Sequence, residues 1–305
     1  MALGSRILKS IPAIVANCCA ALFAADASAT VVRFATSLGN VDVRMYNAAT
    51  PLTVANFLNY TAANQFDGTF IHRAPQNFVV QGGGFTLTPP SFANVVPSNA
   101  PVMNEPGISN IRGTIAMAKT GAGPNTATNQ WFFNIDDNSA NLDFQNGGFT
   151  VFGRIVGNGL SVIDAINALP KYNLEYPTHP DDATFGYVPL RGDNSQALAN
   201  RLVYMNDVAP LNIPAGDYNI DGKVDAVDLA LWKSSLGSTT NAAADGNGNG
   251  VVDGADFLIW QRTFGQNFGA PAAAAIAAVP EPAAATLALL AAAACGLARR
   301  RPRGD

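Results

Sequence analysis

The stretch FIHRAPQNFVVQGGGFT, residues 70–86, decides the fold of the larger part of this chain. It contains the apolar run Phe78–Gln81, followed by three consecutive glycines. Similar short runs occur at 114–118, 131–135 and 151–156, separated by loops rich in Gly, Asn and Pro. Short apolar runs between turn residues are typical of strands. The stretch therefore predicts one of many short strands in a mainly β domain.

The residues before this stretch predict a hairpin and a helix. Residues 31–36 and 41–45 alternate apolar and polar side chains around a turn at 37–40, which indicates two antiparallel strands. Thr50-Pro51 then predicts a helix start, with Thr50 as the cap and Pro51 in the first turn. A second helix is expected over residues 160–169. Many short strands with two capping helices favour a closed antiparallel β-barrel.

Five blocks of sequence, taken in order, resemble the cyclophilin-type peptidyl-prolyl cis-trans isomerases. The resemblance runs from about residue 31 to residue 208 and implies a cyclophilin-like barrel that isomerises X–Pro bonds in polypeptides without a cofactor. The blocks are residues 70–73 with 78–86, 113–119, 129–134, 141–143 and 149–153.

The isomerisation chemistry identifies what such a site needs. Rotation about an amide C–N bond faces a barrier of about 18–20 kcal/mol because the nitrogen lone pair is delocalised. A catalyst must favour the twisted amide, whose nitrogen can accept a hydrogen bond, and must hold the proline ring in an apolar pocket. Arg73 is the expected donor because a guanidinium stays charged and presents a rigid fork.

The resemblance assigns the other site residues. It implies that Gln81 steadies Arg73, that the backbone around Ala118 and Lys119 holds the residue before proline, and that Gln130 binds substrate backbone. The neighbouring His72 is interpreted as a structural residue and not as a base. The proline pocket is assigned to Phe78, Val79, Phe132 and Leu142, with Phe149 at its edge.

A repeat follows the barrel sequence. Residues 217–237 and 245–265 carry oxygen-bearing side chains at matching positions, with a glycine at the sixth position of each loop. This spacing wraps alternate residues around one calcium ion, with a backbone carbonyl at the seventh position and a water-mediated ligand at the ninth. The expected ligands are Asp217, Asn219, Asp221, Lys223, Asp225 and Asp228 in the first loop, and Asp245, Asn247, Asn249, Val251, Asp253 and Asp256 in the second.

Each loop is followed by a single apolar helix that ends Trp-x-x-x-x-Gly, and this pair resembles a dockerin module. The resemblance implies a small α-helical domain with two structural calcium ions and a cohesin-like partner. The second loop carries Asn249 where the first has Asp221, so we expect it to be the weaker calcium site.

The two ends of the chain predict export. Residues 1–29 combine Arg6 and Lys9, an apolar run and an Ala-x-Ala exit, which is typical of a secretory signal peptide. Residues 279–305 begin Pro280-Glu281-Pro282, continue as an Ala/Leu-rich span and end in an arginine cluster. This tail resembles the PEP-CTERM sorting signal, which implies an exosortase-type enzyme and transient anchoring in the bacterial cytoplasmic membrane.

Composition limits the alternatives. A net charge of −4 with 13% charged residues argues against nucleic-acid binding. The predicted organisation is a signal peptide at 1–29, an isomerase domain at 30–210, a dockerin-like domain at 211–268, a linker at 269–278 and the sorting signal at 279–305. The leading interpretation is an exported isomerase tethered to an envelope or extracellular assembly; the alternative is a non-catalytic proline-peptide binding module in a calcium-dependent scaffold. Nothing in the sequence supports a polysaccharide-degrading subunit.

Overall fold

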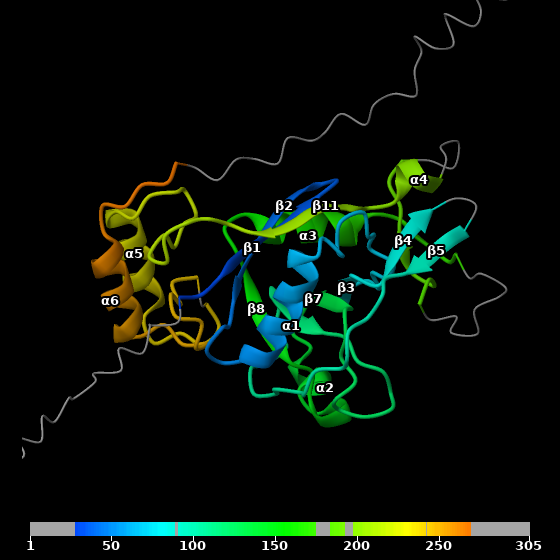
Figure 1. The fold of residues 1–305 in the computed structure, drawn as a ribbon, viewed down its shortest axis with the longest axis horizontal. Coiled ribbons are helices and arrows are strands. Elements are labelled where there is room, and N and C mark those ends of the chain that lie inside the picture. The colour runs from blue at the N-terminus through cyan, green and yellow to red at the C-terminus, as the bar shows by residue number, and fades with distance from the viewer. Residues whose placement is uncertain (1–27, 89–90, 175–183, 193–197, 242, 270–305) are drawn as a thin grey trace, which may run out of the picture.

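A computed structural model describes residues 28–88, 91–174, 184–192, 198–241 and 243–269. Its centre is a curled antiparallel sheet in the order β11-β1-β2-β8-β6-β7-β3 (Figure 1). The strands are β1 (Val31–Thr36), β2 (Gly39–Met45), β3 (Val79–Gly82), β6 (Thr114–Met117), β7 (Trp131–Asn134), β8 (Val151–Val156) and β11 (Met205–Pro210).

The predicted N-terminal hairpin is confirmed. Strands β1 and β2 pair antiparallel from Val31 opposite Arg44 to Thr36 opposite Gly39. One face of the hairpin contributes Phe34 and Val43 to the core. The other face carries an ion pair in which Arg33 Nε lies 2.7 Å from Asp42 Oδ1. The alternation of apolar and polar residues therefore sets the two faces of the sheet.

The sheet is curled but no strand ladder closes it among the described residues, where a closed barrel was predicted. Its end strands are β3 and β11. The segment 70–73 lies between them: the Ile71 amide donates to the Val203 carbonyl (2.9 Å) and the His72 amide donates to the Gln81 carbonyl (3.2 Å). Isolated bridges thus take the place of a continuous ladder, and they bring Arg73 to the edge of β3.

Both predicted helices are present, as α1 (Pro51–Ala62) and α3 (Gly159–Ala168). The predicted cap on α1 is wrong, because the Thr50 side chain makes no capping hydrogen bond. Instead the Glu105 carboxylate accepts the free helix amides of Leu52 (3.1 Å) and Thr53 (2.8 Å). A carboxylate from a distant loop thus accepts the unpaired amides of the first turn, and its negative charge interacts favourably with the positive end of the helix dipole.

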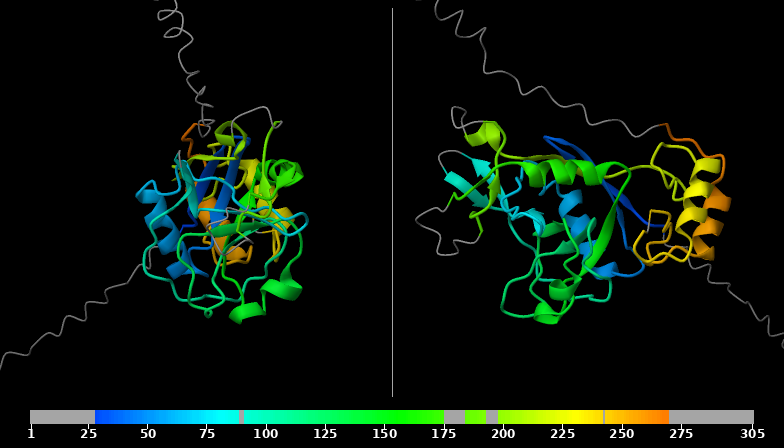
Figure 2. Two further views of the ribbon diagram at one scale, coloured as in Figure 1. Left: turned by 90° about the vertical axis from the view of Figure 1, so that its right-hand side faces the viewer. Right: turned by 180° about the vertical axis from the view of Figure 1, so that it is seen from behind.

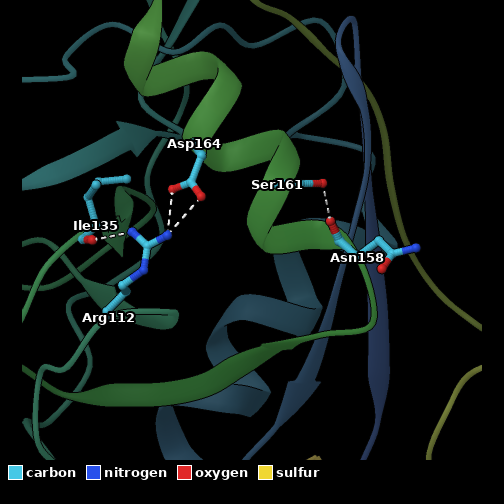
Figure 3. Close-up of polar contacts among 5 residues, drawn as sticks. All are labelled: Arg112, Ile135, Asn158, Ser161 and Asp164. Atoms are coloured by element: carbon cyan, nitrogen blue, oxygen red, sulfur yellow. Dashed lines mark hydrogen bonds and ion pairs between the residues drawn. The ribbon is translucent and has the colours of Figure 1, made fainter.

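Helix α3 is fixed to the loop before β6 by an ion pair (Figure 3). Arg112 Nη2 lies 2.7 Å from Asp164 Oδ2, and Arg112 Nη1 donates to the Ile135 carbonyl (2.6 Å). Ile163 and Ile166 on the opposite side of the helix join the core. Smaller elements complete this half: α2 (Ser139–Leu142), the 3-10 helix η1 (Gln145–Gly147), α4 (Leu198–Arg201), the hairpin of β4 (Phe85–Thr88) and β5 (Ser91–Val95), and the short pair of β9 (Lys171–Tyr172) and β10 (Val188–Pro189).

Aromatic side chains fill the core between α1 and the sheet. Phe34 meets Trp131 edge-on at a ring distance of 5.0 Å and Phe133 at 5.4 Å. Phe57 of α1 stacks on Phe66 at 5.0 Å. Such rings bury large apolar areas and prefer these offset and edge-on geometries.

The C-terminal part of the described chain consists of two loop–helix units at the end of the molecule opposite the β4–β5 hairpin (Figure 2). Their helices are α5 (Ala226–Ser235) and α6 (Gly254–Thr263). Each helix tryptophan donates its indole N–H to the other unit: Trp232 to the Asp253 carbonyl and Trp260 to the Asp225 carbonyl, both at 2.8 Å. The repeat in sequence is thus a pair of reciprocally bonded units.

The chain that connects the sheet to the loop–helix units begins as part of the sheet. Strand β11 pairs with β1 as far as Pro210, and the Leu211 amide still donates to the Val31 carbonyl at 2.7 Å.

No helix of the described residues is long and apolar enough to cross a membrane. The predicted signal peptide, apart from its last two residues, and the predicted sorting tail lie outside the described residues.

Candidate functional site

One cavity of about 310 Å³ collects the residues expected to bind and isomerise a proline peptide. Nine of the ten expected residues line it. The tenth, Gln130, adjoins it and accepts a hydrogen bond from Gln81 Nε2 at 2.9 Å. The lining consists of Arg73, Phe78, Val79, Gln81, Ala118, Lys119, Phe132, Leu142, Gln145 and Phe149.

Arg73 is held at this cavity by backbone and side-chain contacts with β3. The Gln81 amide donates to the Arg73 carbonyl (2.8 Å), and Arg73 Nη1 lies 3.4 Å from Gln81 Oε1. The guanidinium carbon is 5.7 Å from the centre of the Phe78 ring. Burial lowers the pKa of Arg73, yet an arginine side chain remains charged at neutral pH. The site therefore presents a positive donor beside an aromatic face.

The triple glycine at the end of β3 makes the Gln81–Gln130 contact possible. Gly83 has a φ of +84°, which favours glycine. A Cβ on Gly84 would lie 2.7 Å from Gln130 Nε2 and 2.8 Å from its Cγ. Because Gly84 has no side chain, Gln130 can lie across it and reach Gln81. The glycines thus position a polar side chain as well as turning the chain.

The floor of the cavity is apolar and well packed. Val79, Phe132 and Leu142 are nearly fully buried and belong to one cluster with the half-buried Phe149. The Phe132 and Phe149 rings meet edge-on at 5.9 Å. These side chains come from β3, β7, α2 and the loop before β8, so the tertiary fold and not local sequence assembles the floor.

Lys119 closes one side of the cavity with its side chain. Its ammonium donates to the carbonyls of Gly148 (2.6 Å) and Asn146 (2.9 Å) and lies 4.7 Å from the centre of the Phe149 ring. Burial lowers its pKa. Sequence reasoning gave only the backbone here a role, and it missed Gln145 altogether. Gln145 begins the 3-10 turn that Lys119 holds, and no pattern in its sequence neighbourhood indicates the cavity.

His72 precedes Arg73 but does not line the cavity. It is fully buried, with its ring edge-on to Phe85 at 4.9 Å and to Phe185 at 6.2 Å. Burial, reinforced by the charge of Arg73, lowers the pKa of His72 to about 3. A group that stays neutral throughout the physiological range supports the interpretation of His72 as structural.

The two loops of the repeat have the same internal hydrogen bonds. The first carboxylate, Asp217 or Asp245, accepts the amide of the glycine five residues later (2.8 and 2.7 Å). The twelfth carboxylate, Asp228 or Asp256, accepts the amide of the residue after the first aspartate (2.8 and 2.9 Å). These four carboxylates are fully buried. Each loop is therefore wrapped around an inward-facing acidic pair.

This donor set fits calcium. Burial raises the pKa of Asp217 and of Asp245 to about 6, and a bound divalent cation would restore the charged form. Asn219 Nδ2 donates to Asp221 Oδ2 at 2.9 Å, so the side chains at the third and fifth positions of the first loop lie side by side. Across the described residues, no three His, Cys, Asp or Glu side chains already converge as a metal cluster.

Comparison with known proteins agrees with both halves of this architecture. The family model "Cyclophilin type peptidyl-prolyl cis-trans isomerase/CLD" matches residues 31–184, and the "Dockerin type I domain" model matches residues 215–264. A peptidyl-prolyl cis-trans isomerase of Acinetobacter baylyi is 39% identical over 144 residues, covering 46% of this chain and 73% of the relative. Peptidyl-prolyl cis-trans isomerase A of Dickeya dadantii is 35% identical over 178 residues, covering 56% and 89%.

A crystal structure of a cyclophilin-type peptidyl-prolyl cis-trans isomerase from Cryptosporidium parvum aligns with a TM-score of 0.43 at 19% identity, covering 61% of this chain and 99% of that one. The chain belongs to the cyclophilin-type peptidyl-prolyl cis-trans isomerase family. It is an enzyme of that type and also contains a dockerin type I domain.

Proposed function

We propose that this protein is an exported isomerase of X–Pro bonds whose catalytic donor is Arg73. The observation that supports this most directly is that one cavity joins Arg73 to an apolar floor. The floor of Phe132, Leu142 and Val79 receives the proline ring, and Phe78 and Phe149 flank it. A pocket of this composition orients the ring and leaves the amide nitrogen facing the guanidinium.

Catalysis in this proposal is stabilisation of a twisted amide. As the C–N bond rotates, the proline nitrogen regains its lone pair, and Arg73 donates a hydrogen bond to it. A charge-assisted hydrogen bond contributes about 1.5–3 kcal/mol, which corresponds to about one to two decades of rate. No covalent intermediate or proton transfer is needed, so the reaction leaves no chemical change on the enzyme.

Gln81 and Gln130 position the donor and the substrate backbone. Gln81 lies between Arg73 and Gln130 and contacts both, so it restricts the guanidinium to the cavity side of β3. The Ala118 amide donates to the Gln130 carbonyl at 2.9 Å. This hydrogen bond fixes the backbone at Ala118 and Lys119. In this proposal that backbone contacts the substrate residue before proline, while the Lys119 side chain fixes the turn at 145–148.

The dockerin domain gives the enzyme a place in an assembly. We assign calcium to its two loops, with ligands from Asp217, Asn219, Asp221, Lys223, Asp225 and Asp228 and from their counterparts 28 residues later. The repeated hydrogen-bond network around the buried acidic pairs supports this assignment. Calcium would neutralise these pairs and hold each loop closed, which presents the domain to a cohesin-like partner.

The order of segments completes the proposal. Residues 1–29 act as a signal peptide, 30–210 as the isomerase domain, 211–268 as the dockerin-like domain, 269–278 as a linker and 279–305 as a PEP-CTERM sorting signal processed by an exosortase-type enzyme. The protein would then act on exported polypeptides in the envelope or outside the cell. The signal-peptide and tail sequences support this location.

The test is the isomerisation rate of a short X–Pro peptide, measured by exchange NMR with residues 30–278. Arg73→Ala should lower kcat/KM by about one to two decades. Arg112→Ala is the matched control, because Arg112 forms a half-exposed ion pair with Asp164 away from the cavity. Equal rates in wild type and Arg73→Ala would refute the role of Arg73. An inactive wild type that still binds the peptide would favour the alternative, a proline-peptide binding module.

A further inference from the structure

Arg44 is a charged residue on the outer face of the sheet, yet it is 1% exposed. Its neighbours Val43 and Met45 point into the core of the barrel, so Arg44 would face solvent if the barrel stood alone. The dockerin domain covers it instead. Arg44 Nη2 donates to the Asp217 carbonyl at 2.9 Å, and its guanidinium carbon lies 5.4 Å from the centre of the Tyr218 ring.

This buried cation lies near both calcium loops. Burial lowers the pKa of Arg44, while Tyr218 and the carboxylates of Asp245, Asp217 and Asp256 act in the opposite direction. A buried charge is tolerated only where it is paired or hydrogen-bonded. Arg44 therefore belongs to the interior of a joint structure made by the sheet and the two loops.

The second loop also joins the barrel through its backbone. The Gly248 carbonyl accepts the amides of Ala48 and Ala49, each at 3.1 Å, in the segment between β2 and α1. The Gly246 carbonyl accepts the Ala29 amide, just before β1, at 2.8 Å. Three backbone hydrogen bonds thus connect the second and fourth positions of this loop to the start of the isomerase domain.

A comparison of the two loops explains the glycine at the fourth position of the second one. Gly248 has a φ of +70°, but the equivalent residue of the first loop is Ile220 with a φ of +62°. The loop conformation alone therefore does not require glycine. A Cβ on Gly248 would lie 2.7 Å from both the Met45 carbonyl oxygen and the Asn47 amide nitrogen. Glycine is needed there because the barrel backbone approaches so closely.

We infer that the dockerin domain is docked on the barrel through Arg44 and Gly248, so that calcium in its second loop stabilises the isomerase domain itself. The calcium part of this inference rests on the proposed function; the docking does not. A ligand that binds only the folded protein raises the folding equilibrium constant by a factor of 1 + [L]/Kd. At a calcium concentration about 100 times Kd, the barrel would open about 100-fold less often.

Hydrogen exchange of the full-length protein, followed by mass spectrometry, separates the two halves. Peptides covering β7 (Trp131–Asn134) report the barrel and peptides covering α6 (Gly254–Thr263) report the dockerin domain. We expect calcium, compared with EGTA, to slow exchange in both peptides of the wild type, by up to about 100-fold. In Gly248→Ala, calcium should still slow exchange in α6 but change exchange in β7 by less than about threefold, because the clash separates the halves.

Gly237→Ala is the matched control. Gly237 also has a positive φ, of +80°, but no atom lies within 4 Å of the position of a Cβ there. This variant carries the backbone strain without the clash and should keep the wild-type response in β7. Arg44→Met is a second test of the docked face and should likewise uncouple β7 from calcium.

The outcomes distinguish the docking from the calcium sites. Slower exchange in α6 alone, in wild type, would overturn the inference and leave calcium binding intact. If calcium alters neither peptide, the calcium assignment fails and the docking is judged in EGTA. There Gly248→Ala must exchange faster in β7 than Gly237→Ala, and equal rates would overturn the docking.

Discussion

Buried, neutral His72 makes a contribution to the stability of the fold that is lost in mild acid. The pKa of His72 is about 3 in the folded protein, against an ordinary value of 6.5. Between these two pH values, His72 binds a proton in the unfolded chain but not in the folded chain. The stability that the fold gains from neutral His72 is therefore fully present above about pH 6.5 and is lost as the pH falls towards 3. At 1.36 kcal/mol per pKa unit, the loss is about 2 kcal/mol between pH 7.5 and pH 5, and about 4 kcal/mol by pH 3.

The assay is urea unfolding of wild type and His72→Leu at pH 7.5 and at pH 5, in the presence of EGTA. Asp217 and Asp245, whose pKa values are raised to about 6, act in the opposite direction and stabilise the fold as the pH falls. They are common to both proteins, so the difference between the two pH-dependent changes isolates His72. We expect the change in unfolding free energy from pH 7.5 to pH 5 to be about 2 kcal/mol less favourable in the wild type than in the variant. Equal changes in both proteins would show that His72 is not the buried neutral group described here.

Three further predictions concern the cavity and the loops. Gly84→Ala should displace Gln130 and lower kcat/KM about 2- to 13-fold, the loss of one neutral hydrogen bond, whereas Gly121→Ala, with no atom within 4 Å of its Cβ position, should leave the rate unchanged. The kcat/KM of the wild type should be flat from about pH 6 to pH 8, because the cavity lining includes no histidine, cysteine or carboxylate; a bell-shaped profile would contradict the mechanism. Calcium titrations should show a larger loss of affinity for Asp217→Ala than for Asp245→Ala, and equal or reversed losses would contradict the ranking of the loops.

The β1–β2 hairpin, strands β3, β6, β7 and β8 and helices α1 and α3 could be predicted from short-range patterns, whereas the smaller elements and β11 were not. Alternation along 31–36 and 41–45 sufficed for the hairpin, and Pro51 marked the start of α1. The cap on that helix could not be predicted, because Glu105 lies far along the chain and nothing near Thr50 indicates that its hydroxyl donates to the Tyr46 carbonyl instead (3.3 Å). Closure of the sheet was overestimated for a related reason, since runs of strand residues do not reveal which edges pair.

The residues of the cavity could likewise be predicted only in part. The resemblance to a family supplied ten site residues, and the structure brings them together, because the order of blocks along the chain carries the fold with it. Gln145 and the side chain of Lys119 escaped notice because their roles depend on one turn. That turn is held by an ammonium from another loop, and its sequence has no distinguishing pattern.

The relation between the two halves was the least predictable feature, and the reason lies in single residues. On the sequence, Gly248 is one more glycine in a calcium loop and Arg44 is one polar residue in an alternating strand. Gly248 is explained by the backbone of Met45 and Asn47, which lie far from it in the chain. Arg44 is explained by the carbonyl of Asp217, which also lies far from it in the chain. A repeat pattern describes what the two loops share. The docking depends on how they differ, since Ile220 and Gly248 occupy the same position but only the glycine lies against the barrel.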